Sequence, residues 1–147
     1  MVVGGRWSVV VIGYGSDLRG DDAAGPRVAE AVRGWGLAGV DAIAAHQLVP
    51  ELAEPLARAR RAIFVDAAAG ARRVTMTPLE AGGAPGALGH AGDPRALLAA
   101  AAALYGARPE AWLVALPAAS FELGADLSEA AERGVAEALA LIQELIR

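Results

Sequence analysis

The sequence predicts an α/β fold in three layers, α/β/α, with a mainly parallel twisted sheet of about five strands and helices on both faces. Three observations lead to this prediction. Short runs rich in Val and Ile are continuous rather than alternating, which is typical of strands buried on both faces. Stretches with helical spacing separate these runs. No linker divides the 147 residues, so we expect a single domain spanning residues 1–147.

Strands and helices are expected to alternate through the first half of the chain. The runs VVVIG and AIFVDA are continuous and apolar, and between them Val28, Ala31, Val32 and Trp35 recur at helical spacing. Glycines 34 and 36 end that helix. In order, we expect a strand at 8–13, a helix at 22–35, a weaker Ala-rich strand at 40–45, a helix at 50–58 that begins with Pro, and a strand at 62–67 that ends on the carboxylate of Asp66.

The second half contains two further strands and two helices. Residues 73–77 are β-branched and alternate, which favours an exposed or edge strand. Residues 80–92 are rich in Gly and should form a flexible loop. Asp93 followed by Pro94 is typical of a helix start, and this Ala-rich helix should reach Tyr105. Residues 111–116 form another buried strand, and Ser128 should cap a terminal helix that ends near Ile146.

Composition excludes several classes of function. The net charge of −4 provides no basic surface for nucleic acid or anionic lipid. The absence of Cys excludes disulfides, thiolate zinc sites, iron–sulfur clusters and a Cys nucleophile. No apolar run approaches the about 18 residues of a membrane span, and the N-terminal run lacks the layout of a cleavable signal. We therefore expect a cytoplasmic protein that binds neither nucleic acid nor membrane.

Acidic residues and one histidine are the candidates for chemistry. The pair Asp21 and Asp22 follows the first strand, Asp66 ends the third, and His90 lies in the Gly-rich loop. Because the carboxyl ends of parallel strands lie along one sheet edge, these groups can converge although they are far apart in sequence. Two carboxylate oxygens and one imidazole nitrogen would form a three-ligand site with open positions for Ni, Zn, Fe or Mn.

Each candidate also has an ordinary structural explanation. Asp22 at a helix start would commonly be an N-cap, which stabilises by about 0.5–2 kcal/mol. Asp66 could instead accept hydrogen bonds from N–H groups of the following turn, and His90 could be a solvated loop residue. His46, the second histidine of the chain, precedes an expected helix start, where a surface or contact role is favoured over metal ligation.

The sequence argues against two other kinds of site, a dinucleotide site and the active site of a serine hydrolase. The residues G-Y-G at 13–15 begin like a dinucleotide fingerprint, but Leu18 occupies the position of the third glycine, and the second strand lacks an acidic residue for a ribose hydroxyl. The acid pair would also repel a pyrophosphate. No G-x-S-x-G elbow is present, and Ser16 has no nearby base, so a serine hydrolase is disfavoured.

The run GYGSDLRGDDAAGPRVAEAV resembles the N-terminal signature of the nickel–iron hydrogenase maturation endopeptidases, G-x-G-N-x-L-x-x-D-D/E-x-x-G followed by a helix. The resemblance covers nearly the whole chain. It continues, in the expected order and spacing, through HQLVPELAEPLARARRAIFVDAAAG and PGALGHAGDPRALLAAAAALYGARPEAWLVALPAASFELGADLSEAA.

The resemblance implies a metal site of two carboxylates and one histidine. By motif position these ligands fall on Asp22, Asp66 and His90, the residues that the strand order already indicates. The chain departs from the family pattern at two points. Ser16 replaces the usual Asn, so a hydroxyl must make any hydrogen bond of that amide. Around His90, Gly-His and Asp93-Pro94 replace the common Thr-His and Ser-Pro setting, although Asp93 can still cap the helix.

The resemblance further implies an endopeptidase that removes the C-terminal peptide of a nickel–iron hydrogenase large-subunit precursor after nickel insertion. Nickel would be supplied by the substrate, and other divalent metals could occupy the site. Asp21 is a candidate base or a residue that favours the helix dipole. His46 and Gln47 are candidates for substrate contact. The alternative is a non-catalytic metal- or partner-binding module on the same fold. We expect a monomer that acts on the precursor.

Overall fold

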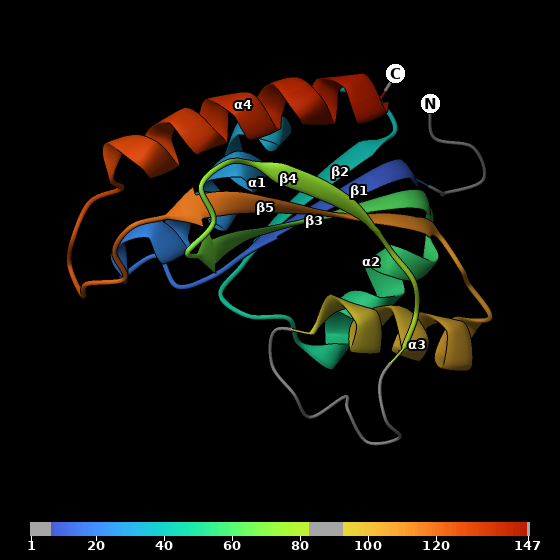
Figure 1. Ribbon diagram of the computed structural model, residues 1–147. Helices are drawn as coiled ribbons and strands as arrows, with labels where there is room; N and C mark the ends of the chain where they lie inside the picture. The colour runs from blue at the N-terminus through green and yellow to red at the C-terminus, as the bar shows by residue number, and fades with distance from the viewer. Residues whose placement is uncertain (1–6, 83–92, 147) are drawn as a thin grey trace.

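The computed structural model describes residues 7–82 and 93–146, whose strands form one five-stranded sheet (Figure 1). The strands are β1 (Trp7–Tyr14), β2 (Val40–Ala45), β3 (Ala59–Ala69), β4 (Thr75–Leu79) and β5 (Glu110–Ala118). The helices are η1 (Gly20–Ala23), α1 (Ala24–Gly34), η2 (Pro50–Leu52), α2 (Ala53–Ala57), α3 (Pro94–Tyr105) and α4 (Glu129–Ile146), where η marks a 3-10 helix.

Helices cover both faces of the sheet, which confirms the predicted three-layer α/β/α fold. Figure 1 shows α1 and α4 on one face and α2 and α3 on the other. Each face has its own apolar core. Val28 and Ile142 are fully buried in the core beneath α1 and α4, whereas Phe64 and Leu56 are fully buried in the core beneath α2 and α3. None of the described helices is both long and apolar enough to cross a lipid bilayer.

The strand order β2-β1-β3-β5-β4 places a change of direction between β1 and β3. From β1 the chain moves outward to β2 on one side, and it then returns to β3 on the other side of β1. All strands are parallel except β4, which pairs antiparallel with β5 at the edge of the sheet. The edge strand expected at 73–77 is therefore confirmed. In open α/β sheets, ligands bind at such a change of direction, beside the carboxyl ends of the flanking strands.

Gly13 and Gly25 let α1 lie directly on the sheet. A Cβ atom on Gly25 would lie 2.6 Å from the carbonyl oxygen of Val65 and 2.7 Å from that of Tyr14. A Cβ atom on Gly13 would overlap the carbonyl oxygen of Gly25. Since any larger residue would push the helix away, these glycines serve the packing of α1 on β1 and β3.

The expected elements are confirmed, with differences at their ends. The region expected to be one helix at 22–35 begins as the 3-10 turn η1, and the helix expected at 50–58 divides into η2 and α2. The third strand does not end on Asp66 as expected, because pairing with β5 carries β3 on to Ala69. The expected caps are present: Asp93 accepts hydrogen bonds at the start of α3, and Ser128 does so at the start of α4. Most of the Gly-rich loop expected at 80–92 lies outside the described residues.

Candidate active site

Asp22 and Asp66 flank the change of direction between β1 and β3. Asp66 lies on β3, and Asp22 lies in η1, the turn that follows β1. Burial raises the pKa of the Asp66 carboxyl to about 6, and the negative charge of Asp22 adds to the rise. Hydrogen bonds from the Ala67 N–H and the Tyr14 hydroxyl oppose it. The structure thus brings the two carboxylates close enough for one to influence the protonation of the other.

The Asp22 carboxylate bonds back to the turn that precedes it and does not cap α1. Its Oδ2 atom accepts a hydrogen bond of 2.6 Å from the Ser16 N–H. Gly15 adopts φ +144°, and a Cβ atom there would overlap the Asp22 backbone and lie 3.0 Å from Oδ1. The Ser16 hydroxyl, which replaces the Asn of the family signature, accepts a 3.3 Å bond from the Leu18 N–H. This tight turn fixes Asp22 through one oxygen and leaves Oδ1 without a hydrogen bond to the described residues.

Asp21 has a different environment from its neighbour. Its side chain is fully buried and accepts four hydrogen bonds: from the N–H groups of Ala119 (2.6 Å), Ser120 (3.2 Å) and Ser128 (2.7 Å), and from the Ser128 hydroxyl (2.7 Å). Burial raises the pKa of Asp21, but these bonds, led by that of the Ser128 N–H, outweigh the rise, and the pKa lies below its usual value. A carboxylate that already accepts four hydrogen bonds and has a low pKa is a poor general base. Asp21 instead connects η1 to the segment between β5 and α4.

Tyr14 is a site residue that the sequence analysis did not identify. It is the last residue of β1, its side chain is buried, and its hydroxyl is hydrogen-bonded to Asp66. Burial and the charge of Asp66 raise the pKa of Tyr14 well above its usual value, so the hydroxyl keeps its proton. The signal in the sequence was a phenol that closely follows the apolar run at 9–12, since a buried tyrosine hydroxyl needs a partner.

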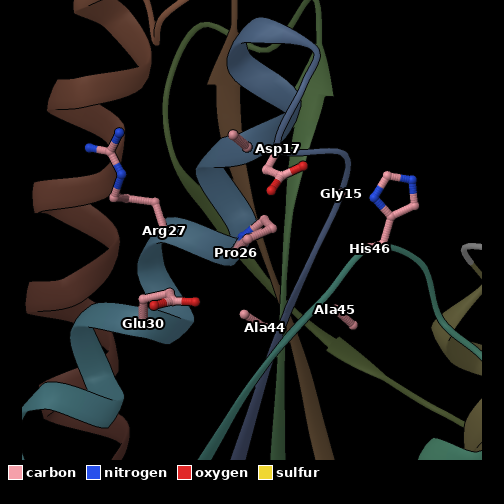
Figure 2. Close-up of a pocket in the computed structure, with 9 residues that line it drawn as sticks. Gly15, Asp17, Pro26, Arg27, Glu30, Ala44, Ala45 and His46 are labelled. Carbon is pink, nitrogen blue, oxygen red and sulfur yellow. The ribbon is translucent and has the colours of Figure 1, made fainter.

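The remaining predicted residues are His90, His46 and Gln47. His90 lies outside the described residues, and residues 7–82 and 93–146 contain no group of three or more His, Cys, Asp or Glu side chains arranged to hold a metal. His46 and Gln47 are exposed in the bend after β2. His46 lines a cavity of about 480 Å³ between that bend and α1. Figure 2 shows its ring across from Pro26 and Glu30 of α1. Neither Asp22 nor Asp66 is among the described residues that line this cavity.

The chain is similar to known proteins in its three-dimensional structure. No protein-family model matches the sequence, and no curated protein matches it either. Among solved structures, the chain is similar to the hydrogenase maturating endopeptidase HybD from E. coli, with a TM-score of 0.75 and 22% identity over 95% of this chain and 91% of that one. It is also similar to a hydrogenase 2 maturation peptidase from a Thaumarchaeota archaeon, with a TM-score of 0.69 and 27% identity over 94% of this chain and 97% of that one.

A third similar structure is the nickel–iron hydrogenase maturation protease HycI from Thermococcus kodakarensis. Its TM-score is 0.69 and its identity 22%, over 99% of this chain and 96% of that one. The alignments extend along almost the full length of each chain. The structure therefore matches the fold of the hydrogenase maturation proteases, as the resemblance in sequence implied.

Proposed function

We propose that this protein, whose fold matches that of the hydrogenase maturation proteases, is an endopeptidase that removes the C-terminal peptide of a nickel–iron hydrogenase large-subunit precursor after nickel insertion. One observation carries the proposal. Asp22 and Asp66, the two acids that match the family's ligand positions, flank the change of strand direction, and the charge of Asp22 raises the pKa of Asp66 beyond the effect of burial. Similar solved structures are named as hydrogenase maturation endopeptidases and proteases.

The chemistry of the carboxylate pair suits a divalent cation. Burial raises the pKa of Asp66, and repulsion between its charge and that of Asp22 raises it further. A cation between them removes that repulsion, and carboxylate oxygens bind nickel together with imidazole nitrogens. In this proposal the nickel belongs to the substrate, which holds it through its own ligands. Asp22, Asp66 and His90 complete its coordination, so that only a precursor that carries nickel is bound productively.

The proposed third ligand is close in sequence to the described part of the site. His90 lies three residues before Asp93, and three residues of extended chain span at most about 11 Å. Asp93 is the N-cap of α3, which lies on the same side of the sheet as Tyr14. Its charge adds to the effects of burial and of Asp66 in raising the pKa of Tyr14. In this proposal His90, separated from Asp93 by two residues, is the third ligand.

The chain's own carboxylates have distinct parts in the proposed reaction. Asp22 stays fixed by the Ser16 N–H while its second oxygen contacts the cation. Asp66 holds a proton more readily than an ordinary aspartate, and it releases this proton when the nickel of the precursor binds. Asp21 takes no part in proton transfer because its oxygens already accept four hydrogen bonds, and it holds the surrounding segments in place.

Cleavage of nickel-loaded and nickel-free precursor tests this function. The natural protein should cleave only the nickel-loaded precursor, and Asp22→Ala and Asp66→Ala should abolish cleavage. Asp126→Asn, which changes an exposed acid between β5 and α4, is the control and should cleave normally. Equal cleavage of both precursors, or unchanged cleavage by Asp22→Ala, refutes the proposal. Tight binding of nickel without substrate, combined with no cleavage of either precursor, would instead support the non-catalytic binding module.

A further inference from the structure

Tyr14 and Asp66 occupy neighbouring positions on two paired strands. β1 and β3 are parallel, with Gly13 opposite Val65, so the next residue on each strand is Tyr14 and Asp66. Side chains alternate between the faces of a strand. Tyr14 shares the core beneath α2 and α3 with Phe64, and Asp66 follows Phe64 by two residues. Both side chains therefore point to the same face, at the carboxyl end of the central strand pair.

The environment of Tyr14 holds its ring firmly. The side chain is only 5% exposed and packs in a core that includes Leu48 of the segment after β2 and Leu97 and Leu98 of α3. Its hydroxyl is hydrogen-bonded to the Asp66 carboxylate. Within the described residues, no buried side-chain nitrogen or oxygen lacks a hydrogen-bond partner. A rigid ring that ends in a hydroxyl is suited to fix the rotation of a neighbouring carboxylate, because the donor itself cannot move.

We propose that Tyr14 is a positioning residue of Asp66: its hydroxyl donates to the carboxylate and fixes the orientation in which that carboxylate meets a divalent cation. This assignment rests on the proposed function, in which Asp66 is a metal ligand. Both acids of the site are then held by hydrogen bonds before a cation binds. Asp22 has one oxygen held by the Ser16 N–H, and Asp66 accepts from the Tyr14 hydroxyl and the Ala67 N–H.

The conservative variant Tyr14→Phe isolates the hydroxyl. Phenylalanine keeps the ring and its packing, so only the bond to Asp66 is lost. Tyr105 is the second tyrosine of the chain, it is 54% exposed at the end of α3, and Tyr105→Phe is the matched control. Thermal unfolding of each variant shows whether the fold is retained.

The test uses Ni²⁺ alone as the probe of affinity and Co²⁺ alone as the probe of geometry. Calorimetric titration of the natural protein with Ni²⁺ should show binding that Asp66→Asn removes. Tyr14→Phe should weaken this binding by about 10- to 100-fold. It should also change the visible d–d absorption of bound Co²⁺, because a carboxylate that has lost the Tyr14 bond can change its angle of contact with the ion. A residue needed only for folding would not alter the Co²⁺ spectrum of a folded variant.

The outcomes separate this inference from the proposed function. Ni²⁺ affinity and a Co²⁺ spectrum of Tyr14→Phe that match those of the natural protein and Tyr105→Phe overturn the assignment. Absence of Asp66-dependent Ni²⁺ binding in the natural protein overturns it as well. If Ni²⁺ binds through Asp66 and depends on the Tyr14 hydroxyl, but no precursor is cleaved, the positioning role stands and the endopeptidase proposal fails.

Discussion

Replacement of Asp21 by Asn should destabilise the protein strongly, although the two side chains have nearly the same shape. The carboxylate accepts four hydrogen bonds, from three backbone N–H groups and the Ser128 hydroxyl. An amide has one oxygen, which can accept two of them, and its NH₂ group faces donors instead of acceptors. At least two donors therefore lose their acceptor inside the protein.

The magnitude follows from these bonds. A hydrogen bond to a charged group contributes about 1.5–3 kcal/mol, so the loss of two lowers the free energy of unfolding by about 3–6 kcal/mol. Proteins of this size are stable by about 5–15 kcal/mol, so the loss is a large fraction of the total. The midpoint of thermal unfolding should fall by roughly 10–20 °C. The pKa of Asp21 is lowered, so this stabilisation is complete above the unfolded pKa of about 3.9 and is lost as the pH falls below it.

Urea unfolding at pH 7, followed by tryptophan fluorescence, measures the effect. Asp21→Asn is compared with the natural protein and with Asp126→Asn. Because Asp126 is exposed, its substitution should change the free energy of unfolding by less than about 0.5 kcal/mol. A loss below about 1 kcal/mol for Asp21→Asn would refute the reasoning, because it would mean that the buried carboxylate is not the acceptor that these segments require. Persistence of the full difference at pH 2 would contradict the assigned pKa direction.

Two further predictions concern the packing of α1 and the pH dependence of stability. Gly25→Ala should lower the free energy of unfolding by at least about 2 kcal/mol, because the added methyl meets the carbonyl oxygens of Tyr14 and Val65. Gly34→Ala in the same helix has nothing within 4 Å of the new methyl and should stabilise by about 0.5–1 kcal/mol; urea unfolding of both variants checks the contrast. Asp66 has a folded pKa of about 6, above its unfolded value, so its contribution is fully present below about pH 4 and is lost as the pH rises through 6. After treatment with a chelator, the free energy of unfolding of Asp66→Asn should therefore rise relative to that of the natural protein by about 1–3 kcal/mol as the pH is raised from 4 to 7. A difference that stays constant across that range would contradict the shift.

Local features of the fold were predictable because they depend on residues close in sequence. Asp93 accepts hydrogen bonds from N–H groups two and three residues later, and the Ser128 hydroxyl accepts from the N–H three residues later. Such caps can be recognised from a few adjacent letters. The bounds of β2 were also predicted correctly, although this strand is Ala-rich and contains Asp41.

The ends of elements and the surroundings of the acids depend on distant partners. β3 continues past Asp66 because Ala67, Ala68 and Ala69 pair with β5, and that pairing has no trace in the sequence of β3 itself. The bond between Tyr14 and Asp66 requires that β1 and β3 be neighbours and in a particular register. Periodicity predicts that strands exist, but it does not specify which residues of two strands meet.

Asp21 and Asp22 show most clearly what the sequence and the tertiary structure each determined. By itself, the sequence determined that two adjacent carboxylates follow the first strand and that a third acid lies near the end of a later strand. It also indicated that the carboxyl-end edge of a parallel sheet is where ligands bind. Only the tertiary structure separated the two neighbours. Asp21 accepts its hydrogen bonds from residues 98 to 107 positions away, whereas Asp22 bonds to a turn six residues back and influences Asp66 across the strand pair. A carboxylate's protonation and contacts are set by the donors and charges around it in space, and those are decided by the packing of the whole chain.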